Sequence, residues 1–215
     1  GIVKLDPKII ESLTEEITDY REITTRANTA SISEFLNLIF AAALKINASD
    51  IHFQPGESAI TLRLRIDGVL HHILDIEPAH FSQIKKRIKL LARLKLNIEN
   101  QPQEGSFSIK VKNEQIDMRV SAIPSNFGET LTIRVLNPGR IALEFEALGL
   151  NESARAIIER EIKKPNGMII TTGPTGSGKT TTLYTILKKL NQESTQIITL
   201  EDPIEYKLPG IVQMQ

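Results

Sequence analysis

Hydrophobic and polar residues follow two different periods along the first part of the chain. From Ile60 to Ile66 apolar residues occupy every second position, with arginine or threonine between them, and this period of two predicts a β-strand with one buried face. Asp67-Gly68 follows as a hairpin-turn signal, and residues 69–74 are expected to return as the partner strand. The sequence predicts further strands at 51–54, 106–111, 115–122 and 130–136.

Helical spacing of apolar residues occurs before and between these strands. Ser31 and Glu34 have the S-x-x-E spacing of a capping box, which predicts that a helix begins there, and the pattern continues to about Ile46. Its polar positions form only a thin stripe, so this helix is expected to be well buried. A second helix is expected over 78–96. The block 31–137 is therefore predicted to be an α+β domain with a mostly antiparallel sheet.

The residues on either side of this block differ from it in composition. Residues 1–30 are expected to form a helical arm and a linker, because isolated apolar positions give way to a stretch rich in Thr, Ser and Asn over 24–33. Asn137-Pro138-Gly139 is expected to be a domain joint. Residues 138–215 then form a second predicted domain.

The second domain has the pattern of an α/β fold. Asn151 is expected to cap a helix that ends at Pro165-Asn166-Gly167, and the short apolar run 168–172 predicts a buried parallel strand. Apolar residues recur with helical spacing over 183–190, and 196–200 predicts the next strand. Because such a sheet needs several more strands to bury both faces, we expect the 215 residues to be a fragment of a longer chain.

A glycine-rich segment lies between the first predicted strand and the next helix of this domain. Residues 173–180 fit the phosphate-binding pattern G-x-x-x-x-G-K-[ST] at every fixed position. In such a loop the backbone N–H groups wrap a phosphate, Lys179 adds positive charge, and the Thr180 hydroxyl can ligate Mg²⁺. The order of strand, glycine loop and helix directs a helix N-terminus at an anion. The residues expected to bind the phosphates are Gly173, Pro174, Thr175, Gly176, Ser177, Gly178, Lys179, Thr180 and Thr181.

Three acidic residues, Glu201, Asp202 and Glu205, come directly after the strand expected at 196–200. In open parallel sheets ligands bind at the carboxyl ends of strands, so these carboxylates could orient the attacking water or, as we expect for Glu201, hold Mg²⁺ through water. A solvated acidic turn is the alternative, and it carries most weight for Glu205. Only one helix and one strand separate this segment from Lys179, which favours an accessory acidic box over the Walker B element.

Arginines occupy polar positions of the predicted antiparallel sheet. Arg65, Arg119 and Arg134 alternate with apolar neighbours, and such residues could deliver charge to the γ-phosphate held by a neighbouring subunit. Taken alone, the pattern favours an ordinary solvent-exposed face of a sheet. A second basic group, consisting of Lys85, Lys86, Lys89 and Arg93, lies on one face of the helix predicted at 78–96, but no aromatic residues interleave with it for base stacking. A solvated face or a subunit contact is therefore favoured over a nucleic-acid interface there.

Composition excludes several classes of function. The 26 basic and 26 acidic residues balance, so bulk charge does not point to nucleic acid or to an anionic membrane. There are no cysteines, which excludes disulfides and cysteine-ligated zinc. No apolar run approaches the roughly 20 residues that span a bilayer, and no signal-peptide pattern is present.

Taken together and in order, these motifs resemble the hexameric ATPases of type II secretion and type IV pilus assembly, over about residues 31–215. The resemblance implies an α/β protein overall, with a PAS-like sheet domain followed by the start of a RecA-like P-loop domain. The motifs that carry it are Ala48–Pro55, Leu64–Leu70, Gly128-Glu129-Thr130, Gly173–Tyr184 and Thr199–Tyr206.

The resemblance also implies a function. Members of this family are motor subunits that bind ATP and Mg²⁺ at the subunit interfaces of a ring, and hydrolysis drives pilin or pseudopilin movement through an inner-membrane platform protein. It implies a homo-oligomer, a hexameric ring in the cytoplasm at the inner membrane, and no nucleic-acid partner. Motif matching puts Arg65, Arg119 and Arg134 at arginine positions of the family. The expected catalytic residues are Lys179, Glu201, Asp202, Glu205, Arg65, Arg119 and Arg134.

The chain departs from the family pattern in places. His71 stands where an arginine is often found, and Asn100, Glu104 and Ser106 replace residues around a Pro-Gln-Asp-Gly segment that is usually flanked by basic residues. The Walker B element and the His box are expected after Gln215, so these residues alone are expected to hydrolyse ATP slowly or not at all. Two alternatives stay open, a nucleic-acid translocase with a P-loop core and an interaction module that binds ATP without hydrolysing it.

Overall fold

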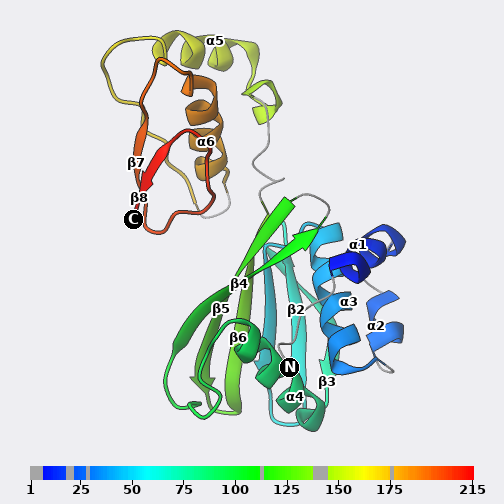
Figure 1. Ribbon diagram of the computed structural model, residues 1–215. Helices are drawn as coiled ribbons and strands as arrows, with labels where there is room; N and C mark the ends of the chain where they lie inside the picture. The colour runs from blue at the N-terminus through cyan, green and yellow to red at the C-terminus, as the bar shows by residue number, and fades with distance from the viewer. Residues whose placement is uncertain (1–6, 18–21, 28–29, 112–113, 138–144, 175–176) are drawn as a thin grey trace. The chain divides into compact units, whose positions relative to one another are not determined.

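A computed structural model describes residues 7–17, 22–27, 30–111, 114–137, 145–174 and 177–215. The chain divides into two compact units, Gly1–Asn137 and Pro138–Gln215 (Figure 1). Within the described residues, none of the helices has the length and apolar character needed to cross a membrane.

The first unit contains a six-stranded sheet with the strand order β3-β2-β1-β6-β5-β4. Every neighbouring pair is antiparallel, which confirms the predicted α+β class for this part of the chain. At the β2–β3 hairpin, Asp67 and Gly68 have φ angles of 48° and 83°, the left-handed pair that a tight two-residue turn requires. The strands are β1 Asp50–Pro55, β2 Ile60–Ile66, β3 Val69–Ile76, β4 Gln103–Val111, β5 Glu114–Ser125 and β6 Gly128–Leu136.

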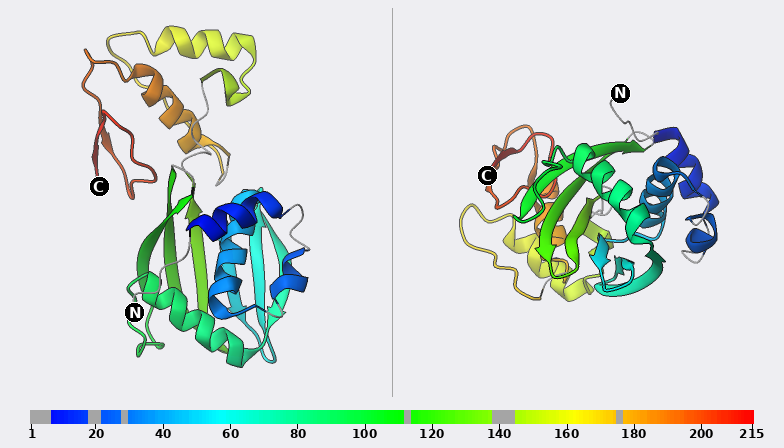
Figure 2. Two further views of the ribbon diagram at one scale, coloured as in Figure 1. Left: turned by 45° about the vertical axis from the view of Figure 1, so that its right-hand side comes forward. Right: turned by 90° about the horizontal axis from the view of Figure 1, so that it is seen from below.

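Helix α3 (Ile32–Lys45) is the central helix of the first unit. Its predicted capping box is present, because the Ser31 hydroxyl accepts from the Glu34 N–H and the Glu34 carboxylate accepts from the Ser31 N–H at 2.8 Å. All residues from Phe35 to Leu44 are buried, as the thin polar stripe predicted. Figure 2 shows α3 and α4 (Pro78–Leu91) on the same face of the sheet.

Helix α4 ends earlier than its apolar pattern predicts. It stops at Leu91 instead of Leu96 because Arg93 adopts a left-handed φ of 58°. The Leu94 N–H then donates to the Lys89 carbonyl at 2.8 Å and the Arg93 N–H to the Leu90 carbonyl at 3.2 Å. These two bonds form a Schellman motif, which closes a helix and turns the chain away from its axis.

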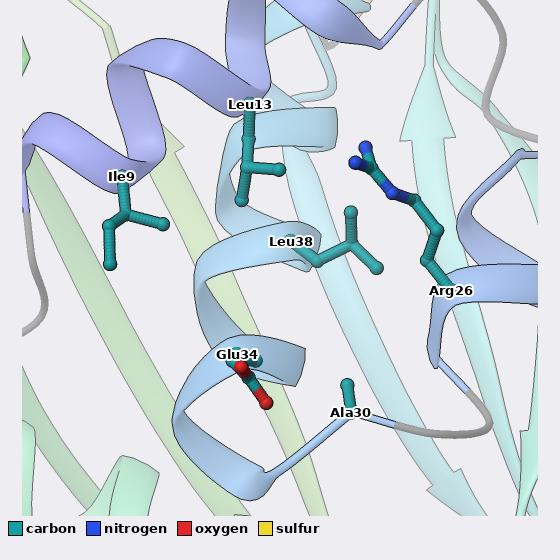
Figure 3. Close-up of a pocket in the computed structure, with 6 residues that line it drawn as sticks. All are labelled: Ile9, Leu13, Arg26, Ala30, Glu34 and Leu38. Carbon is teal, nitrogen blue, oxygen red and sulfur yellow. The ribbon is translucent and has the colours of Figure 1, made fainter.

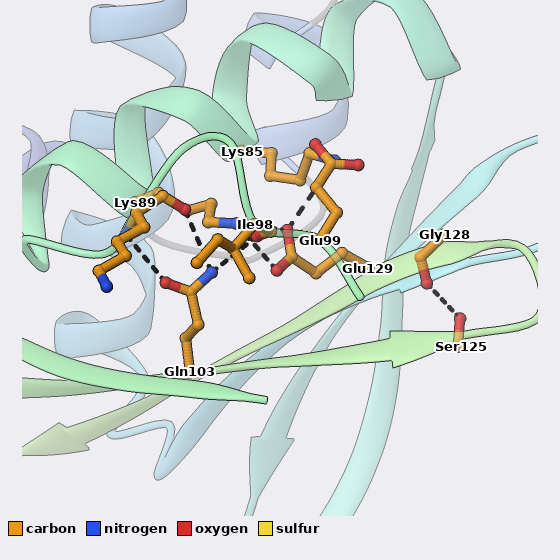
Figure 4. A network of polar contacts seen from close by, with 9 residues as sticks. Lys85, Lys89, Ile98, Glu99, Gln103, Ser125, Gly128 and Glu129 are labelled. Carbon is orange, nitrogen blue, oxygen red and sulfur yellow. Dashed lines mark hydrogen bonds and ion pairs between the residues drawn. The ribbon is translucent and has the colours of Figure 1, made fainter. Parts of the chain in front are cut away.

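The segment that follows α4 packs over a buried ion pair between Lys89 and Glu129 (Figure 4). The Lys89 ammonium donates to both carboxylate oxygens of Glu129 at 2.9 Å and to the Ile98 carbonyl at 2.7 Å. The Gln103 side chain accepts from the Lys95 N–H and donates to the Lys95 and Ile98 carbonyls. The predicted solvated basic face is therefore wrong for Lys89, because this loop folds over it.

The described helices of the predicted N-terminal arm are part of the first unit. Helices α1 (Pro7–Glu16) and α2 (Glu22–Ala27) lie against α3, and Ile10, Ile17 and Ile23 are fully buried in the core. The Thr-, Ser- and Asn-rich stretch that predicted a linker therefore begins inside α2. A cavity of about 430 Å³ lies among these helices (Figure 3), and it is lined by Ile9, Leu13, Arg26, Ala30, Glu34 and Leu38.

The second unit contains a short parallel sheet and two longer helices. Strand β7 (Ile198–Leu200) pairs with β8 (Val212–Met214). Helix α5 (Glu152–Glu161) is capped as predicted, because the Asn151 side chain accepts from the Ala154 N–H at 2.8 Å. It ends at Glu161, before the predicted Pro165. Helix α6 is Lys179–Leu190, and a 3₁₀ turn spans Phe145–Leu148.

The predicted strand at 168–172 is absent. No strand of the described residues pairs with this segment, and Met168 and Ile170 are 84% and 77% exposed. An extended segment becomes a strand only when a neighbour accepts and donates its backbone hydrogen bonds. The prediction that this apolar run forms a buried parallel strand is therefore wrong for this structure.

Candidate nucleotide-binding site

The glycine-rich loop leads directly into helix α6. Gly173 has a φ of 150°, and a Cβ atom there would lie 2.7 Å from the Ser177 hydroxyl oxygen. Gly178, with a φ of 88°, is the residue before the helix. Both positions therefore require glycine. Of the predicted phosphate ligands, Thr175 and Gly176 lie outside the described residues.

Lys179 is the first residue of α6, and its side chain folds back over the loop. Its ammonium donates to the carbonyls of Gly173 at 2.8 Å and Pro174 at 2.7 Å. The positive charge is thereby held above the loop backbone. In the glycine-loop pattern this is the position from which a lysine reaches the phosphates of a nucleotide.

The N-terminus of α6 presents backbone donors at the same place. The N–H groups of the first turn, which includes Thr180 and Thr181, have no carbonyl partner within a helix. Gly178 has no side chain with which to cap them, and the first turn contains no acidic residue. The helix dipole adds partial positive charge at this end. This end of the helix therefore favours a bound anion. The exposed Thr180 hydroxyl lies in the same turn and could supply an oxygen ligand to a metal ion.

Glu201, directly after β7, accepts hydrogen bonds from three side chains. Its carboxylate accepts from the Thr199 hydroxyl at 2.6 Å, from the Gln213 amide at 2.9 Å and from the Tyr184 hydroxyl. Burial acts to raise the pKa of this carboxyl, but these hydrogen bonds outweigh it and lower the pKa of Glu201 below its usual value. Glu201 is therefore ionised at neutral pH.

Tyr184 was not among the residues predicted from the sequence. It lies on α6, one and a half turns after Lys179, and is only 4% exposed. Burial and its bond to Glu201 raise the pKa of Tyr184 to about 12. A buried tyrosine needs a partner for its hydroxyl, and this is the signal that could have identified it. Asp202 is exposed and Glu205 half-buried on the loop that follows Glu201.

The predicted arginines belong to the first unit, where strand register brings them into one row. Arg119 lies opposite Arg134, Arg134 opposite Asp50, and Asp50 opposite Arg65. The buried Asp50 carboxylate forms ion pairs with Arg65 at 3.3 Å and Arg134 at 3.2 Å. The row lies on the sheet face opposite the one that buries Ile51. Sequence reasoning missed Asp50, although its position next to Ile51 already places it on the arginine face.

Comparison with known proteins adds to this geometry. A family model described as "Type II/IV secretion system protein" matches residues 25–215. The chain belongs to this family. This confirms the resemblance that the ordered motifs predicted.

Individual relatives agree with the family match. The chain is 41% identical over 204 residues to type II secretion system protein E of Pectobacterium carotovorum subsp. carotovorum, covering 95% of this chain and 41% of that protein. It is 37% identical to type II secretion system ATPase E of Vibrio cholerae serotype O1, with the same coverage. The chain therefore spans about two fifths of the length of these curated relatives.

One solved structure of a motor protein is also similar. It is the pilus retraction motor PilT with bound ADP, at a TM-score of 0.57 and 28% identity, covering 82% of this chain and 50% of that one. The likeness supports the α/β class.

Proposed function

We propose that this chain is the nucleotide-binding part of a motor ATPase subunit that couples ATP hydrolysis to pilin or pseudopilin assembly in protein secretion. The observation that carries the proposal is the loop before α6, whose Gly173 and Pro174 carbonyls hold the Lys179 ammonium at the N-terminal end of that helix. Membership in the secretion family and the likeness to a pilus motor support the same reading.

The donor atoms at the loop suit Mg²⁺ held together with a nucleotide. Among the described residues there is no cluster of three or more His, Cys, Asp or Glu side chains that could hold a metal alone. Mg²⁺ prefers oxygen ligands and usually keeps several waters while bridging to substrate phosphates. Thr180 would supply one oxygen, and Glu201 would act through a bound water. The ion neutralises charge on the phosphates when it is bound.

The remaining predicted residues would act at the interfaces between subunits of a ring. Arg65, Arg119 and Arg134 would present positive charge to the nucleotide of a neighbouring copy, and Asp202 and Glu205 would complete the acidic segment. A homo-hexamer at the cytoplasmic side of the inner membrane, bound to a platform protein, follows from the proposal. These roles would complement each other, since phosphoryl transfer depends on positioning and on charge stabilisation.

Calorimetry with Mg²⁺–ATP tests the proposal. Lys179→Ala should abolish measurable binding, whereas Lys188→Ala, which removes a lysine from the last turn of the same helix, should bind normally. Equal affinity of the wild type and Lys179→Ala would contradict the proposal. In the full-length subunit Glu201→Ala should spare binding and reduce turnover, which separates a motor from a module that binds ATP without hydrolysis.

A nucleic-acid translocase receives less support from the structure than from the sequence. Its basis was the basic face of the helix at 78–96, and Lys89 of that face is buried against Glu129. Lys85 is paired with Glu99 at 2.8 Å. Binding of DNA that weakens steeply with salt would restore this alternative.

A further inference from the structure

We propose that Tyr184 is a positioning residue that holds the Glu201 carboxylate and thereby fixes the acidic segment 201–205 to the nucleotide-binding helix α6. The inference rests on the proposed function and concerns a residue that ends the Gly173–Tyr184 motif but to which the sequence analysis gave no role. Tyr184 is placed to act through Glu201, since its hydroxyl contacts that carboxylate and the ring is buried.

The contacts of Glu201 show why its orientation is fixed. One carboxylate oxygen accepts from both Thr199 and Gln213, and the other accepts from Tyr184. Thr199 is in β7 and Gln213 is in β8, so the first oxygen ties Glu201 to the short parallel sheet. The Tyr184 hydroxyl connects the second oxygen of Glu201 to α6, the helix that begins with Lys179.

Gln213 extends the same network to the loop after Glu201. Its amide nitrogen donates to Glu201 at 2.9 Å and to the Tyr206 carbonyl at 2.8 Å, and its amide oxygen accepts from the Leu208 N–H at 2.7 Å. The Tyr206 ring meets the Tyr184 ring edge-on, with centroids 6.0 Å apart. The loop carrying the acidic residues is therefore held from both sides, by β8 and by α6.

This arrangement has a consequence for the chemistry. A carboxylate that orients a water or a hydrated ion is effective only when its own position is fixed. Three side-chain donors fix Glu201, and the one from α6 relates it to the helix whose first turn would bind the phosphates. Loss of that donor should loosen the carboxylate while leaving the phosphate loop intact. The proposal therefore predicts an effect on turnover and little effect on nucleotide affinity.

Tyr184→Phe is the sharpest variant, because it removes one hydroxyl and keeps the ring that packs against Tyr206. Thr185→Val is the matched control, since Thr185 is the adjacent buried residue and its hydroxyl donates to the Thr181 carbonyl within α6. In the full-length subunit, Tyr184→Phe should lower kcat by about ten- to a hundredfold, as expected for a lost hydrogen bond to a charged group. KM and the Kd for Mg²⁺–ATP should stay within about threefold, which marks an interaction needed for the reaction rather than for binding.

A double-mutant cycle tests whether Tyr184 acts through Glu201. If it does, adding Tyr184→Phe to Glu201→Gln should cause no further loss, because the contact is already altered. Additive losses would overturn the proposal. So would a Tyr184→Phe enzyme with normal or raised kcat, a loss equal to that of Thr185→Val, or an effect confined to nucleotide affinity.

A titration separates this inference from the proposed function. With ¹³C-labelled glutamate in the chain of residues 1–215, the carboxyl signal of Glu201 should titrate at higher pH in Tyr184→Phe than in the wild type, because one donor that favours the charged form is gone. The same shift should be absent in Thr185→Val. This readout needs no ATP. If Mg²⁺–ATP does not bind but the shift is seen, the proposed function fails while the Tyr184–Glu201 contact stands; if the shift is absent, the positioning role fails.

Discussion

Lys89→Met would remove the ammonium group that neutralises a buried carboxylate in the first unit. Glu129 has a fully buried side chain, and Lys89 is 1% exposed. Breaking a buried ion pair by removing one partner costs about 3–5 kcal/mol, because the other charge is left uncompensated. Lys85 remains 3.9 Å from the Glu129 carboxylate and offsets part of this penalty. We therefore expect the free energy of unfolding to fall by about 3 kcal/mol, the lower end of that range.

The contacts around the pair allow the charge effect to be isolated. The Ile98 carbonyl, which Lys89 also binds, keeps a donor from the Gln103 amide at 2.7 Å. The double variant Lys89→Met/Glu129→Met thus leaves no buried charge and no orphaned carbonyl at this position, and it should recover most of the loss, since buried pairs can be replaced by apolar residues at little cost. Lys86→Met removes an exposed lysine from the same helix and should change stability by less than about 0.5 kcal/mol.

Urea unfolding followed by far-UV circular dichroism measures these differences, and hydrogen exchange of the β6 amides assigns the transition to the first unit. A loss below about 1 kcal/mol for Lys89→Met would mean that the pair contributes no more than an exposed one. The reasoning would also be refuted if the double variant were as unstable as the single one. In that case shape, and not charge, would determine the stability of this region.

Two further predictions concern other contacts. A Cβ atom on Gly105 would lie 2.3 Å from the Ala92 carbonyl oxygen and 2.7 Å from a methyl group of Leu94. Gly105→Ala should therefore destabilise the first unit by about 1–3 kcal/mol, the usual cost of overpacking. An unchanged urea midpoint would contradict the close approach of β4 to the end of α4. The hydrogen bonds that lower the Glu201 pKa stabilise the folded chain above the usual glutamate pKa of about 4.3, and this stability is lost as pH falls through the lower, folded pKa. Glu201→Gln should therefore make the second unit less sensitive to acid between pH 7 and pH 3, measured as the change in urea midpoint, and an unchanged pH dependence would argue against the ionised network.

Features governed by local sequence were predictable. The period of two in β2 and the turn at Asp67-Gly68 determine a hairpin without reference to the rest of the chain. The Ser31 cap and the side chain of Asn151 act within one turn of their helices, so their spacing alone located both helix starts. The glycine-loop pattern is equally local, and the positive φ angles of Gly173 and Gly178 agree with it, while phosphate binding by the loop stays a prediction.

Features that depend on distant segments were not predictable in the same way. Lys89 lies on the polar side of its helix, and it becomes buried because the loop held by Gln103 covers it. The strand expected at 168–172 depends on a pairing partner that no pattern within the segment specifies. Helix α4 illustrates a smaller failure, since its apolar spacing continues beyond the point where Arg93 turns the chain.

Asp50 and Glu201 show how the fold organises residues that the motifs identify only singly. Asp50 is the buried acceptor between Arg65 and Arg134, and Glu201 is the acceptor that gathers donors from β7, β8 and α6. Ordering a long side chain such as arginine costs up to about 2 kcal/mol of conformational free energy. When a carboxylate already holds that side chain in the folded chain, this cost is not incurred again on ligand binding. If Arg65 and Arg134 meet a nucleotide as we propose, their ion pairs with Asp50 would therefore lower the conformational cost of that contact.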